Sequence, residues 1–163
     1  MFKEGDLVVY PAQGIGKIEG IQSTSVDGQK KDFYIMRILD NDMRIMVPVQ
    51  NANHVGVRQL IEKKDVPKVF EILKRKEISV SASTWNKRYR EYMEKVKSGS
   101  IFELAEVFRD LNLLKEDKNL SFGERKMLDT TKSLIVKEIA LVENEKEEVI
   151  ERRINECFSS RRK

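Results

Sequence analysis

The spacing of the apolar residues changes once along this chain of 163 residues. In the first part, apolar and β-branched residues stand in short runs between turn residues, which is typical of strands. After Leu60 they recur every three or four positions, which is typical of amphipathic helices. The sequence therefore predicts an α+β protein with domains at 1–60 and 61–160 and a boundary near residues 56–65.

The first domain has four segments of strand composition, separated by residues that favour turns. The segments are Leu7–Tyr10, Ile15–Ile21, Phe33–Leu39 and Arg44–Val49. Four or five strands within about sixty residues predict a small, strongly bent β-barrel of the SH3 or Tudor kind. An all-α helical domain should follow it.

The segment that ends near Pro48 has the composition of an edge strand. Proline lacks an N–H group, so its strand ends there or lies at the edge of the sheet. Ile45, Met46 and Val47 would then line an apolar edge. Such an edge either receives a strand from a partner or is protected by the proline, and the sequence leaves both interpretations open.

The second domain carries signals for five helices. Two of them open with a capping box, in which Ser100 precedes Glu103 and Ser121 precedes Glu124. The residues expected to face inward on the last three helices are Ile101, Leu104, Ala105, Phe108 and Leu111, then Leu128, Thr131, Ile135, Ile139 and Val142, then Val149, Ile150, Ile154 and Phe158. The final helix should span Lys146–Phe158.

Two predicted helix starts carry cations, where the positive end of the helix dipole favours carboxylates. Lys87, Arg88 and Arg90 follow the only tryptophan, Trp85. Arg125 and Lys126 lie at the start of the fourth predicted helix. A nearby polyanion would remove the penalty, because phosphate oxygens accept hydrogen bonds from Lys, Arg and helix N-termini. We predict a nucleic-acid-binding surface here, with Trp85 pressing on exposed bases.

The helix that starts at Trp85 also has an ordinary interpretation. Trp85, Tyr89, Tyr92, Met93 and Val96 recur at close to helical spacing, with the cations on the other side. A stripe of this kind is usually a buried face. The tryptophan is therefore either a core residue or an exposed contact.

Charge and reactive residues narrow the class of function. Seven basic and seven acidic residues balance up to Leu60, so the net charge of +4 lies entirely in the second domain. His54 and Cys157 are the only residues of their types and predict neither a zinc site nor a catalytic set. Charged residues at the N-terminus and short apolar runs predict neither a signal peptide nor a membrane span. We expect a cytoplasmic binding protein without metal or cofactor, and not an enzyme.

Several parts of the sequence carry a resemblance to a known family. They are Phe2–Asp6 with Val9–Pro11 and Gly14, then Val47–Pro48, Val55–Arg58, Trp85–Tyr89 and Leu120–Leu128. The chain resembles, over nearly its whole length, the CarD/CdnL family of bacterial RNA polymerase-binding transcription regulators, and it is most similar to the CdnL branch.

The resemblance implies a Tudor-like domain that binds the polymerase β subunit, and a helical domain that binds double-stranded promoter DNA just upstream of the −10 element. Trp85 matches the family's tryptophan wedge, which enters the minor groove at the upstream edge of the transcription bubble. Lys87, Arg88, Arg90 and Lys126 match or adjoin DNA-contacting positions, and we add Arg125 beside them. The expected polymerase-binding strand is Arg44, Ile45, Met46, Val47 and Pro48.

One departure from the family concerns the polymerase contact. Some members have arginine at the positions of Met46 and Thr24, so apolar and backbone pairing would have to replace an ionic contact here. Two other functions remain open on the sequence, an RNA- or ribosome-binding module and a protein-only adaptor with a solvated basic face. We expect a monomer, because no long heptad pattern predicts a dimer.

Overall fold

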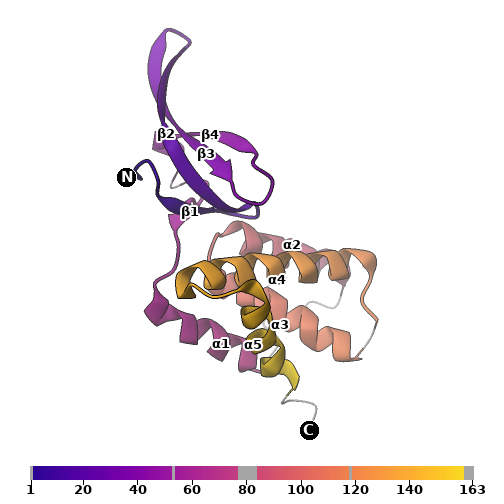
Figure 1. Ribbon diagram of the computed structural model, residues 1–163. Coiled ribbons are helices and arrows are strands. Elements are labelled where there is room, and N and C mark those ends of the chain that lie inside the picture. Colours follow the sequence, from indigo (N-terminus) through magenta and orange to yellow (C-terminus); the bar gives the residue numbers. More distant parts are fainter. Residues whose placement is uncertain (1, 53, 77–83, 118, 160–163) are drawn as a thin grey trace. The chain divides into compact units, whose positions relative to one another are not determined.

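The computed structural model describes residues 2–52, 54–76, 84–117 and 119–159 (Figure 1). The chain divides into two compact units, Met1–Leu60 and Ile61–Lys163. Strands make up the first unit and helices the second. The predicted α+β fold class is confirmed.

In the described part of the first unit, five strands form an antiparallel sheet. They are β1 (Leu7–Tyr10), β2 (Gly14–Val26), β3 (Gln29–Ile38), β4 (Arg44–Pro48) and β5 (Arg58–Gln59). Their order across the sheet is β4-β3-β2-β1-β5, so β4 and β5 lie at its edges. A short 3-10 turn, Val49–Asn51, follows β4.

Residues on one face of these strands form the apolar core of the sheet. Val8, Ile18, Tyr34, Met36, Ile38 and Val47 are each at most 3% exposed. Gly16 lies against this core, where a Cβ atom would come within 2.5 Å of Met36 Cγ. Strand β2 therefore needs a glycine at this close approach.

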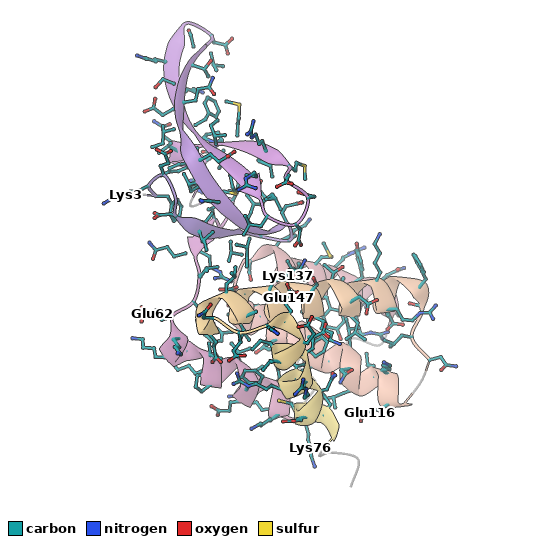
Figure 2. The ribbon with its side chains drawn as sticks, in the orientation of Figure 1. Lys3, Glu62, Lys76, Glu116, Lys137 and Glu147 are labelled. Atoms are coloured by element: carbon teal, nitrogen blue, oxygen red, sulfur yellow. The ribbon has the colours of Figure 1, made fainter. Side chains whose placement is uncertain are left out.

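The β2–β3 hairpin is longer than the sequence predicts. Its strands pair as far as Val26 and Gln29, where Asp27 and Gly28 form a two-residue turn with φ values of 52° and 77°. Turns of this kind match the twist of the strands and extend a hairpin readily. Apart from Val26, the added residues are polar, and most are exposed; side chains project from both faces of the hairpin (Figure 2). They lack the apolar alternation from which strands are recognised.

The second unit is built around one central helix. Its helices are α1 (Val66–Lys74), α2 (Trp85–Lys97), α3 (Ile101–Asp117), α4 (Phe122–Glu143) and α5 (Glu147–Ser159). Helix α3 packs against α1, α2 and α4, and α5 packs against α1 and α4 (Figure 1). The apolar face predicted for α3 is fully buried, whereas Val142, near the end of α4, remains partly exposed.

Helix α3 also buries two charged residues that hydrophobic spacing does not predict. Arg109 and Asp110 are 3% and 0% exposed. The Arg109 guanidinium donates from Nη1 to the carbonyl oxygen of Ile72 at 3.3 Å and from Nη2 to Asp110 Oδ1 at 3.4 Å. Buried polar groups need such partners, and here they fix α3 against the last turn of α1.

A hydrogen bond joins the start of the second unit to α4. The backbone N–H of Ile61 donates to Glu138 Oε2 at 2.9 Å, and Glu138 is 2% exposed. The backbone of the second unit is therefore bonded to α4 at Ile61, its first residue.

Candidate nucleic-acid interface

Helix α2 begins at Trp85 with a side-chain cap. The hydroxyl oxygen of Thr84 accepts a hydrogen bond from the backbone N–H of Lys87 at 3.4 Å, and no acidic residue stands in the first turn. The structure describes the backbone of Trp85, while its indole ring lies outside the described part of the chain. The position of Trp85 at a helix start is thus fixed by the cap on the preceding residue.

Helix α4 begins with the predicted capping box. The backbone N–H of Glu124 donates to Ser121 Oγ at 3.3 Å, and the backbone N–H of Ser121 donates to Glu124 Oε1 at 3.1 Å. This reciprocal pair satisfies two N–H groups that the helix cannot satisfy itself. The Glu124 carboxylate therefore points back over the helix start.

A buried ion pair joins the starts of α2 and α4. Arg88 Nη2 donates to Glu124 Oε2 at 3.2 Å, and the two side chains are only 11% and 3% exposed. The sequence-based expectation placed Arg88 among the exposed cations. The structure instead gives it a partner within the protein, because the capping carboxylate of the other helix lies within reach.

The remaining predicted cations are exposed. Lys87 and Arg90 lie on the first two turns of α2, and Arg125 and Lys126 lie on the first turns of α4. Because the Arg88–Glu124 pair holds these starts together, all four cations belong to one end of the helical unit. Neighbouring cations of this kind suit a phosphate backbone.

Exposure along α2 rises toward its start. Val96 and Tyr92 are 4% and 0% exposed, whereas Tyr89, one turn after Trp85, is 44% exposed. Of the residues described on the predicted buried face, Tyr92 and Val96 are therefore buried and Tyr89 is exposed, while the Trp85 ring lies outside the described part of the chain. At the other end of α2, Lys95 donates to Glu103 Oε2 at 2.9 Å on α3.

The phenol of Tyr92 lies within a cluster of charged groups. Burial, followed by the negative charge of Asp110, raises the pKa of Tyr92 well above its ordinary value. The charges of Arg88 and Glu124 act on the same phenol with opposite signs. The inner side of this end of the helical unit is thus a cluster of polar groups from α2, α3 and α4.

Lys95 shows the balance of burial and pairing at the end of α2. Burial alone would lower the pKa of Lys95, but hydrogen bonds to Glu106 and Glu103 outweigh it, so the pKa is raised. The lysine therefore stays charged at neutral pH and holds α2 against α3.

Strand β4 presents the other predicted contact. Met46 is 49% exposed, whereas Val47 is 3% exposed and belongs to the core of the sheet. Ile45 is partly buried against that core, and Arg44 pairs with Glu19 through an Nε–Oε1 distance of 3.0 Å. Of the five expected contact residues, Val47 therefore has only its backbone available at the edge.

Comparisons with known proteins cover both units. A model described as the CarD C-terminal domain matches residues 68–155, and one described as the CarD-like/TRCF RID domain matches residues 2–61. The chain belongs to the CarD/CdnL family of transcription regulators. YdeB of Bacillus subtilis (strain 168), named as a candidate transcription factor, is 32% identical over 142 residues, which is 87% of this chain and 92% of YdeB.

Two solved structures from Myxococcus xanthus are similar to part of this chain. CdnLNt from Myxococcus xanthus is 49% identical and covers 39% of this chain and 89% of its own, with a TM-score of 0.34. The solution structure of the N-terminal domain of Myxococcus xanthus CarD is 37% identical and covers 36% of this chain and 79% of its own, with a TM-score of 0.32.

Other site chemistries find no support in the described part of this CarD-family chain. Its residues include no cluster of three or more His, Cys, Asp or Glu side chains that could hold a metal ion. Within the same residues, no helix is long and apolar enough to cross a membrane. Cys157 is a buried thiol whose Sγ donates to the carbonyl oxygen of Arg153 at 3.5 Å.

Sequence reasoning missed one exposed residue of this interface, Phe122. It is the first residue of α4 and is 75% exposed. The available signal was its position directly after Ser121, outside the apolar face of the helix.

Proposed function

We propose that this CarD-family protein regulates transcription initiation by stabilising the open promoter complex. The first unit binds the RNA polymerase β subunit through the edge strand β4. The helical unit binds promoter DNA at the upstream edge of the −10 element, and Trp85 inserts into the minor groove there. Lys87, Arg90, Arg125 and Lys126 hold phosphates, which positions the tryptophan without reading a sequence.

The observation that carries the proposal is the Arg88–Glu124 ion pair. It brings two helix starts together, and each start bears exposed cations. Cations at helix starts are unfavourable in the free protein, and a phosphate backbone would relieve this. Tyr89, one turn after Trp85, is 44% exposed, so α2 offers an accessible aromatic side chain near its start.

A wedge can favour the melted state without high affinity for DNA. Unstacking a base step costs a few kcal/mol, so an inserted ring stabilises only DNA that is already distorted. A preference of about 1.4 kcal/mol for the open state changes the ratio of open to closed complexes tenfold. Docking on polymerase supplies the local concentration that a weak DNA contact needs.

The proposal is tested with Trp85→Ala. We expect the variant to shorten the lifetime of the open complex by about tenfold, because the wedge is absent, while affinity for RNA polymerase stays unchanged. Lifetime is measured by competitor challenge of preformed complexes, and affinity by titration of labelled polymerase. Leu141→Ala is the matched control, since Leu141 is an exposed apolar residue far along α4.

Two results would contradict the wedge. If Trp85→Ala reduced polymerase affinity and open-complex lifetime equally, Trp85 would not act specifically on DNA. A fall in melting temperature much larger than that of Leu141→Ala would indicate a core tryptophan instead.

A further inference from the structure

Strand β4 ends before its neighbour β3 does, which leaves a notch at one end of the sheet edge. The two strands pair as far as Phe33 and Pro48, and the chain then turns into Val49–Asn51. Strand β3 extends beyond this point to Gln29, paired with β2 alone (Figure 1). Within the described sheet, residues 29–32 therefore have a neighbouring strand on one side only.

The notch offers more basic than acidic groups. It measures about 220 Å³ and is lined by Lys30, Lys31, Asp32, Pro48, Val49 and Gln50. Both lysines are exposed. Asp32, the one carboxylate of this lining, accepts a hydrogen bond from Ser23 Oγ on β2. An anion that enters the notch therefore meets two ammonium groups, while the carboxylate is already bonded within the sheet.

The cations at the other end of β4 have partners within the protein. Arg44 Nε lies 3.0 Å from Glu19 Oε1, and Arg37 Nη1 lies 2.9 Å from Asp42 Oδ1. Among the described residues, neither lysine of the notch has such a carboxylate partner. A carboxylate from another protein would therefore reach these lysines without breaking an ion pair.

One of the two lysines lies on the exposed face of the β4 edge. Residues two apart in a strand share a face, so Lys31 lies on the same face as Phe33 and Ile35. These two residues pair with Pro48 and Met46, and Met46 is 49% exposed. The face that carries Met46 therefore continues past the end of β4 to the Lys31 ammonium.

We infer that the notch binds a carboxylate of the RNA polymerase β-subunit segment that docks on β4, with Lys31 as the principal contact and Lys30 beside it. A strand added to β4 can continue past Pro48, where no further residue of β4 stands between its side chains and the lysines. Hydrogen bonds between an ammonium and a carboxylate are stronger than those between neutral groups. The inference rests on the proposed function, because it takes β4 as the docking edge.

This ionic contact fixes the register of the added strand. Backbone hydrogen bonds between strands repeat along the chain, so they do not distinguish one register from another two residues away. A carboxylate that must meet Lys31 permits only one of these registers, and charge complementarity of this kind determines specificity more than affinity. The contact adds to the apolar and backbone pairing that the sequence predicts for β4.

Charge reversal in the notch tests the contact through affinity. With the full-length chain and labelled RNA polymerase, we expect Lys31→Glu to weaken binding about tenfold at low salt and Lys31→Arg to bind like wild type. Lys17→Glu is the matched control, since it makes the same change of charge at an exposed position of β2, which β3 separates from β4. The control should lose less than about twofold, and raised salt should narrow the difference between the two variants. Their melting temperatures should agree, because both side chains are exposed.

A zero-length cross-linker identifies the group that the lysine meets. A carbodiimide joins a lysine amine to an adjacent carboxylate as an amide and takes up the released water itself as a urea. In the complex of the wild-type chain with polymerase, we expect an amide between Lys31 or Lys30 and an Asp or Glu of the β subunit, located by mass spectrometry of the digest. Changing that polymerase residue to Lys should weaken binding of the wild-type chain and restore binding of Lys31→Glu.

Several results would overturn the inference. If Lys31→Glu binds polymerase like wild type while Met46→Glu does not, the notch has no part in docking and the proposed function stands. Equal losses for Lys31→Glu and Lys17→Glu would indicate general attraction between charges instead of a contact in the notch. If neither Lys31→Glu nor Met46→Glu changes the affinity, the inference and the proposed docking on β4 fail together. If Lys31→Glu weakens binding to DNA at unchanged polymerase affinity, the lysines contact phosphate and the inference is wrong.

Discussion

Glu124 connects the starts of α2 and α4. Its carboxylate accepts a hydrogen bond from the backbone N–H of Ser121 at 3.1 Å and another from the Arg88 guanidinium at 3.2 Å. Glu124 itself is only 2% exposed. A buried carboxylate with these partners is costly to leave without its cation. Arg88 therefore acts in our proposal as a positioning residue that holds two cationic helix starts together, and the DNA contacts fall to its exposed neighbours.

Replacing Arg88 should cost stability rather than phosphate contacts. We expect Arg88→Leu to lower the free energy of unfolding by about 3 kcal/mol, because Glu124 loses its buried cation. The matched control, Arg90→Leu, removes an exposed cation and should change stability by less than about 0.5 kcal/mol. Urea unfolding followed by circular dichroism measures both.

The same two variants should have the opposite effects on DNA binding, where Arg90→Leu should change the salt dependence and Arg88→Leu should not. Arg90→Leu should reduce the slope of log affinity against log salt by about one, as expected for a phosphate contact. Arg88→Leu should keep the slope when measured where the variant is folded. A flattened slope for Arg88→Leu at unchanged stability would return Arg88 to the DNA surface.

Residue-level prediction from sequence succeeds where one local signal decides. The serine–glutamate spacing predicts the cap of α4, and the structure has both of its hydrogen bonds. No local signal reports that Arg88 meets Glu124, which lies 36 positions away. The burial of Arg109 and Asp110 is likewise set by partners on neighbouring helices and not by spacing. Tertiary contacts of this kind have no signature in a single sequence.

At the scale of elements, amphipathic faces predict well and polar strands do not. The buried face of α3 and the position of β1 agree with expectation, because both follow from periodicity. The outer part of the β2–β3 hairpin is stabilised by its Asp27–Gly28 turn and by backbone pairing, so its composition resembles a loop. In strand β4, at the edge of the sheet, Val47 is buried in the core and Met46 is exposed.

Charge at the β4 edge should block polymerase docking. We expect Met46→Glu to weaken binding to RNA polymerase by at least tenfold, because an apolar edge that receives a strand would have to bury a carboxylate. Ile21→Glu is the matched control, since Ile21 in β2 is 45% exposed and Met46 is 49% exposed. Binding is measured by titration of labelled polymerase, and equal affinities for both variants would exclude β4 as the docking edge.

At the scale of the whole molecule, the two units divide the proposed work. The first unit carries no net charge and offers an open strand edge, whereas the second carries the basic excess and the paired helix starts. In this proposal, neither surface has a strong effect on initiation by itself. A docked protein without a wedge would leave the transcription bubble unchanged. A weak DNA contact without docking would rarely be occupied. Their covalent connection makes the second binding step intramolecular.

Lengthening that connection should therefore weaken the effect on the open complex without touching either surface. The place for an insertion is between Leu60 and Ile61, because β5 ends at Gln59 and the N–H of Ile61 is already held by Glu138. With about 20 added Gly and Ser residues we expect a shorter open-complex lifetime at saturating occupancy of polymerase, and about 40 should lower the effective concentration a further threefold. Polymerase affinity, measured by titration, should stay constant across the series. A lifetime that ignores linker length would mean that the helical unit acts without being tethered, and a parallel loss of polymerase affinity would mean that the junction itself belongs to the docking surface.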